Sequence, residues 1–305
     1  MQKKEEKMYS ALLVIIYLAF ISLGLPDTLL GSAWPQMHIE LNASLSSAGI
    51  ITMIISMGTV ISSLFSDRLN IKLGTGKVTA ISVLMTAVAL LGFSLSHSFI
   101  ILCVLAVPYG LGAGAVDAAL NNYVALHYSS KHMSWLHCFW GVGASIGPYI
   151  IGTCMAHGLG WRGYSVISVL QFTLTAALFI TLPLWKKVEN SENNVINGNN
   201  ERTQEEPQER KAKSLSEVLH IKGVIYILFA FFCYSAVEQT TTLWCASYLV
   251  LNRSIDSNIA AKFAAFFYIG ITFGRFLCGF IADKLGDKNM IRLGIVIIVA
   301  GIVML

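Results

Sequence analysis

Nine long apolar stretches divide this chain, and they constrain its fold more than any other feature. They cover Tyr9–Trp34, Ser46–Phe65, Val78–Leu95, Phe99–Tyr123, Trp135–Met155, Tyr164–Leu184, Val224–Val250, Ala260–Ala282 and Ile291–Leu305. A helix that crosses a membrane needs about 20 apolar residues, because the hydrocarbon core is about 30 Å thick. The ninth stretch spans only about 22 Å at 1.5 Å per residue. The sequence therefore predicts an all-α membrane protein with eight complete spans and a ninth that is cut short.

The basic residues are distributed unevenly between the two sides that these spans define. If the N-terminus is cytoplasmic, all but four of the 21 Lys and Arg residues fall in cytoplasmic segments. Arg162, Arg253 and Lys262 fall outside, and Arg275 lies within a span. An excess of basic residues on the cytoplasmic side is the general rule for membrane proteins. It predicts a cytoplasmic N-terminus and accounts for the net charge of +4 without a nucleic-acid partner.

One polar segment interrupts the apolar pattern. Only 12% of the whole chain is charged, yet residues 186–220 are rich in asparagine and in charged side chains. Such a composition cannot bury a hydrophobic core, so it predicts a flexible cytoplasmic linker. The chain then divides into an N-terminal six-helix bundle (1–185), the linker (186–220) and a partial C-terminal bundle (221–305).

Three acidic residues lie inside the apolar stretches: Asp27, Asp117 and Glu238. A carboxylate near the bilayer centre costs roughly 2.5–3.5 kcal/mol on insertion scales, so such residues normally face a bundle interior and mark substrate or proton sites. Pro26 directly precedes Asp27 and predicts a bend there. We expect Asp27 and Asp117 to carry protons. The alternative is a carboxylate held by a neighbouring hydroxyl or amide.

Other polar residues in the spans form a candidate solute site. Asp117 and Asn121 share one helix face, and an amide both donates and accepts hydrogen bonds, as sugar hydroxyls require. Trp140 is three residues after His137 and could stack on a sugar ring. We expect seven residues to bind the solute, namely Asn121, Asn122, His137, Trp140, Glu238, Gln239 and Trp244. The alternative is polar bonding between helices. Arg275 is expected to neutralise a carboxylate.

Two cytoplasmic turns are similar to each other. Asp67 and Arg68 occupy the turn after the second span, and Gly279, Asp283, Lys284 and Gly286 occupy the turn after the eighth. Internal symmetry of this kind is typical of transporters built from two related halves. The second copy resembles the GxxxDKxGDK signature of the major facilitator superfamily, which implies a gating role at the cytoplasmic face. Gly143, Gly147 and Pro148 resemble the GxxxGP motif of that superfamily, and such small residues allow close helix packing.

A finer resemblance is to the fucose permease branch, the proton-linked sugar symporters. Asp27 after Leu-Gly-Leu-Pro, Asp117 with Asn121, the His137–Trp140 segment and Glu238 carry it. It implies the major facilitator fold with about nine of 12 spans present, and proton symport of a small polar solute such as a sugar. The runner-up is a drug or metabolite efflux antiporter, which the GxxxGP motif favours. A third possibility is a non-transporting fragment, because the chain stops within the ninth span.

No nucleophile–base pair, metal cluster or phosphate-binding loop accompanies these motifs. We therefore expect no enzymatic activity, no cofactor and no metal. The expected partners are the solute, protons and lipid. We further expect a monomer in a bacterial plasma membrane.

Overall fold

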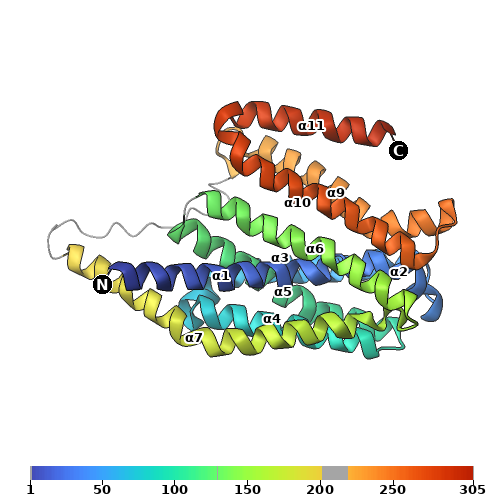
Figure 1. The fold of residues 1–305 in the computed structure, drawn as a ribbon, viewed down its shortest axis with the longest axis horizontal. Coiled ribbons are helices and arrows are strands. Elements are labelled where there is room, and N and C mark those ends of the chain that lie inside the picture. The colour runs from blue at the N-terminus through green and yellow to red at the C-terminus, as the bar shows by residue number, and fades with distance from the viewer. Residues whose placement is uncertain (1, 129, 201–218, 305) are drawn as a thin grey trace.

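Every element that the computed structural model describes is a helix (Figure 1). The described residues are 2–128, 130–200 and 219–304, and in 2–8, 130, 187–200, 279, 282–283 and 287 only the backbone is described. The helices are α1 (Gln2–Asp27), α2 (Leu29–Glu40), α3 (Ser47–Leu73), α4 (Thr75–Leu95), α5 (Phe99–His127), α6 (Ser130–Ala156), the 3₁₀ turn η1 (Gly160–Gly163), α7 (Tyr164–Asn200), α9 (Val224–Arg253), α10 (Ser257–Leu285) and α11 (Asp287–Met304).

Eight segments of the described chain are long and apolar enough to cross a membrane, which confirms the eight predicted spans. The first comprises α1 and α2 together, over Tyr9–Glu40. Large apolar side chains such as Met53, Ile100 and Ile180 are exposed on the outer faces of the helices. Lipid can cover such surfaces, so this pattern is expected of a membrane bundle.

One predicted boundary is wrong. The first repeated turn was predicted around Asp67 and Arg68, but α3 continues to Leu73 and the chain turns at Gly74, which has φ 81°. Gly286 has φ 74° between α10 and α11, so both turns use a glycine in a conformation that side chains disfavour. The predicted linker (186–220) stays a prediction: α7 is helical to Asn200, and residues 201–218 lie outside the described chain.

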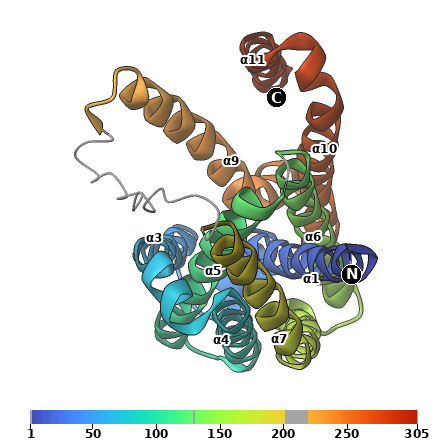
Figure 2. The same cartoon turned by 90° about the vertical axis from the view of Figure 1, so that its left-hand side faces the viewer.

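The helices form two groups (Figure 2). In the first, α1 packs on α6 and α7, α4 packs on α5 and α7, and α3 packs on α5. In the second, α10 contacts α9 and α11. The second group contacts the first where α10 packs along α6 and where α9 contacts α2. Leu243 and Ala246 of α9 are buried, whereas Ile225 and Phe229 near its start are exposed. The two groups therefore meet near the end of α9 and separate toward its beginning.

Candidate functional site

A break in the first span places Asp27 at the end of α1. Pro26 has no N–H, so the carbonyl of Ser22 lacks its helical donor. The side chain of Gln171 on α7 donates to that carbonyl at 2.9 Å, and it also accepts a hydrogen bond from Thr86 at 2.9 Å. Ser22, Gln171 and Thr86 are all buried. A side chain from a distant helix therefore satisfies the group that proline leaves unpaired.

The same device recurs on α6. Pro148 frees the carbonyl of Ala144, and the hydroxyl of Thr28 donates to that oxygen at 3.2 Å. Thr28 lies between α1 and α2, directly after Asp27. The break in the first span after Asp27 is thereby tied to the position of Pro148 in α6.

Replacing Gln171 with Leu should lower the free energy of unfolding by about 1–2 kcal/mol, because it leaves the buried Ser22 carbonyl unpaired. Thermal unfolding of the purified protein measures the change. Thr173→Val is the matched control on α7, since the exposed Thr173 hydroxyl bonds only within its own helix. Equal effects of the two substitutions would contradict this role for Gln171.

Glycines bring α1 and α6 into backbone contact. A Cβ atom at Gly143 would overlap the carbonyl oxygen of Ile21, and one at Gly147 would overlap that of Leu25. A Cβ atom at Gly24 would overlap the carbonyl oxygen of Trp140. The glycines of the GxxxGP motif thus lie against α1, and this contact places the end of α1 beside Trp140.

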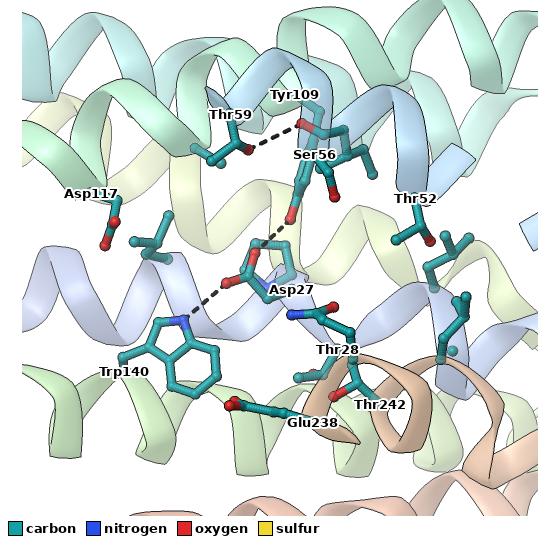
Figure 3. A pocket seen from close by; sticks show the side chains of 18 of the residues that line it. Asp27, Thr28, Thr52, Ser56, Thr59, Tyr109, Asp117, Trp140, Glu238 and Thr242 are labelled. Carbon is teal, nitrogen blue, oxygen red and sulfur yellow. Dashed lines mark hydrogen bonds between the residues drawn. The ribbon is translucent and has the colours of Figure 1, made fainter. Parts of the chain in front are cut away.

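A cavity of about 640 Å³ lies between the two helix groups (Figure 3). Helices α1, α2, α3, α4, α5, α6, α7, α9 and α10 contribute to its wall. Six of the nine predicted solute and proton residues line it, namely Asp27, Asp117, His137, Trp140, Glu238 and Gln239. Residues from both parts of the sequence therefore face one shared space.

The other three predicted residues do not line the cavity. Asn121 donates to the carboxylate of Asp117 at 3.0 Å, so it orients a lining residue. Asn122 is exposed, and Trp244 packs partly buried against the hydrophobic core. Spacing along α5 placed Asn121 correctly beside Asp117 but could not show which of the two reaches the cavity.

Both oxygens of Asp27 accept hydrogen bonds (Figure 3). The Tyr109 hydroxyl on α5 donates to Oδ1 at 3.1 Å, and the indole Nε1 of Trp140 on α6 donates to Oδ2 at 2.9 Å. Hydrogen bonds to an ionised acceptor are roughly twice as strong as neutral ones. Three helices of the first group thus meet at one carboxylate.

Arg275 of α10 lies against the ring face of Trp140. Its guanidinium carbon is 4.9 Å from the centre of the Trp140 ring, within range of a cation–π contact. Its Nη2 is 3.8 Å from Oε1 of Glu238, and its Nη1 donates to the backbone oxygen of His137 at 3.5 Å. The carboxylate nearest to Arg275 is therefore that of Glu238, and the distance between them is longer than that of a strong charged hydrogen bond.

Several residues of the cavity wall were not predicted from the sequence. Thr52, Ser56 and Thr59 of α3 line the cavity, as does Tyr109. The three α3 residues are spaced by four and three positions, so they share one helix face. Their spacing could have indicated a polar helix face from the sequence alone. Nothing local marks Tyr109, because its function depends on a carboxylate 82 residues earlier in the chain.

The residues of the predicted cytoplasmic motif do not line the cavity. Asp67 and Arg68 are exposed in the last turns of α3, and Lys284 is exposed near the end of α10. For Gly279 and Asp283 only the backbone is described. The gating role of this motif stays a prediction.

Comparisons with known proteins agree with this geometry. Residues 16–305 match the model of a family described as the Major Facilitator Superfamily. The chain is 23% identical to Bypass of stop codon protein 6 of Saccharomyces cerevisiae, covering 88% of this chain and 56% of that protein. It is 24% identical to the Cis,cis-muconate transport protein of Acinetobacter baylyi (89% and 66%) and 22% identical to the Glucose/mannose transporter GlcP of Bacillus subtilis (88% and 65%).

The fold is also similar to a solved structure, a bacterial homologue of the human lysosomal transporter Spinster in an inward-facing and occupied conformation. The TM-score is 0.61 at 15% identity, covering 92% of this chain and 63% of that one. At this identity the likeness shows the fold alone. The chain spans between 56% and 66% of the length of the three curated relatives.

Proposed function

The chain belongs to the major facilitator superfamily, and from this premise we propose that it is a secondary active transporter that moves a small polar solute, specifically a sugar, together with protons. The observation that carries this proposal is the cavity between the two helix groups. Its volume of about 640 Å³ lies within the range of roughly 300–1,000 Å³ that is usual for small-molecule sites. A site between the two halves is where transporters of this kind bind their solute.

The chemistry of the wall supports a hydroxylated solute and protons. Asp27, Asp117 and Glu238 supply three carboxylates, and α3 supplies a row of hydroxyl groups. Carboxylates accept hydrogen bonds from solute hydroxyls, and they also bind protons. We assign proton coupling to Asp27 and Asp117. The residues that we assign to solute contact are His137, Trp140, Glu238 and Gln239, with Asn121 holding Asp117 in place.

The similarity to a glucose/mannose transporter supports a sugar as the solute. The excess of basic residues on one side supports a cytoplasmic N-terminus. We place the protein in a bacterial plasma membrane because two of the three curated relatives come from bacteria. In that orientation the separated end of α9 faces the cytoplasm, so the cavity opens inward. We propose that the protein works as a monomer.

Efflux antiport is the second candidate, and the GxxxGP segment favours it. The same glycines serve close packing of α6 on α1 in this structure, which any transport direction requires. Only the direction of coupled flux separates the two functions.

A flux measurement tests the proposal. A thermal-shift screen against sugars, carboxylic acids and cationic drugs first identifies a ligand, because ligand binding stabilises the folded state. The protein in liposomes with an imposed inward proton gradient should then accumulate that solute, and solute addition without a gradient should alkalinise the medium. Solute expulsion by the same gradient would establish antiport and contradict symport.

A further inference from the structure

Trp140 contacts two charged groups at once. Its ring N–H bonds the carboxylate of Asp27 in the first helix group, and its face carries the guanidinium of Arg275 in the second. Arg275 in turn lies beside Glu238 on α9. A series of contacts therefore crosses from one helix group to the other along the cavity wall, in the order Tyr109, Asp27, Trp140, Arg275 and Glu238.

The crossing occurs at α6 and α10, which pack along one another. Cys138 and Gly141 of α6 contact Thr272 of α10, which is one helical turn from Arg275. The two helices are therefore in close contact next to the Trp140–Arg275 pair. Movement of the two groups relative to each other must change this interface. Trp140 is the residue through which Asp27 contacts it.

We propose that Trp140 is a positioning residue that transmits the protonation state of Asp27 to the packing of α10 on α6. This inference rests on the proposed role of Asp27 as a proton site. While Asp27 is ionised, its charged hydrogen bond fixes the plane of the indole, and the fixed plane holds Arg275.

The two donors to Asp27 respond differently to a proton. A tyrosine hydroxyl can turn from donor to acceptor, whereas an indole N–H can only donate. A proton that binds on the Oδ1 side is therefore accommodated by Tyr109. The bond from Trp140 then loses its charged acceptor and weakens. The indole is freed to turn, and Arg275 keeps its contacts to Glu238, to the backbone of His137 and to the side chain of Tyr234.

Other ionisable groups face the same space. The residues that line the cavity with Asp27 include Asp117 on α5, His137 on α6, Tyr164 on α7, Glu238 on α9, and Tyr268 and Arg275 on α10. Protonation of any of them can also change the charge of the cavity. Among the described residues of the wall, however, Trp140 is the one that makes both contacts, a hydrogen bond to Asp27 and a ring contact with Arg275. A variant at Trp140 therefore isolates this route.

The test measures the distance between the two groups at different pH values, without any solute. Spin labels are attached at Ile71 of α3 and Ile225 of α9, two exposed positions, with the native cysteines replaced by alanine. The protein is held in lipid nanodiscs. The wild type should show a distance distribution that shifts as the pH falls from neutral to mildly acidic.

Trp140→Phe removes the N–H donor but keeps an aromatic face for Arg275, and it should lose the pH-dependent shift although Asp27 is intact. Trp185→Phe is the matched control, since Trp185 lies outside the cavity wall and its ring N–H has no hydrogen-bond partner in the described chain. Arg275→Lys keeps the charge but removes the planar group that stacks, so it should also lose the shift. It serves as the second variant if Trp140→Phe does not yield monodisperse protein.

The outcomes separate the two proposals. A wild-type shift that survives in Trp140→Phe, but not in Asp27→Asn, would overturn the role of Trp140 and leave Asp27 as the proton site. A shift that survives in Asp27→Asn would overturn both. Loss of the shift in Asp27→Asn, Trp140→Phe and Arg275→Lys, with the shift retained in Trp185→Phe, is the result we expect.

Discussion

Asp27→Asn should reduce proton-driven solute uptake by about 100-fold or more, equivalent to roughly 2.7 kcal/mol in the rate-limiting step. Asparagine has nearly the same shape as aspartate but cannot take up a proton at any working pH. Its amide nitrogen would also face one of the two groups that now donate to Asp27. Uptake into liposomes under an imposed proton gradient measures the loss.

Exchange of labelled for unlabelled solute should survive better than net uptake in Asp27→Asn, because exchange need not move a proton. Asp256→Asn is the matched control: Asp256 is exposed before α10, and asparagine is an equally good helix cap. The same pair of assays applies to Asp117→Asn. Full proton-coupled uptake in both Asp27→Asn and Asp117→Asn would refute the assignment of these carboxylates.

A large loss of stability is expected when Gly143 is replaced with alanine. The added methyl group would lie where the carbonyl oxygen of Ile21 lies. That oxygen belongs to the backbone of α1, so it cannot move aside as a flexible side chain can. We expect the free energy of unfolding to fall by about 1–3 kcal/mol, the usual cost of overpacking, or by more if α1 separates from α6. Thermal unfolding and the yield of monodisperse protein measure the effect.

Gly270→Ala is the matched substitution for this prediction. A Cβ atom there meets nothing within 4 Å, and alanine favours a helix over glycine by roughly 0.5–1 kcal/mol. Gly270→Ala should therefore leave stability unchanged or slightly raised. A Gly143→Ala protein as stable as Gly270→Ala would show that α6 does not need this glycine to approach α1.

The number and type of helices follow from the sequence because they depend on local properties. A run of about 20 apolar residues has no stable alternative to a helix in lipid, since every backbone polar group must be paired within the segment. The eight spans, the all-α class and the three carboxylates inside them were accordingly visible before the structure. The break between α1 and α2, directly after Pro26 and Asp27, was predictable for the same reason, as proline acts on its own helix.

The composition of the cavity depends on contacts between helices, and the tertiary structure decided it. Gly143 sets how closely α6 approaches α1, and Gln171 satisfies a carbonyl 149 residues earlier in the chain. Helix packing of this kind brings Tyr109 to Asp27 and leaves Trp244 against the hydrophobic core, outside the cavity wall. Local periodicity specifies the face on which a side chain lies, but the crossing of two helices specifies what that face meets.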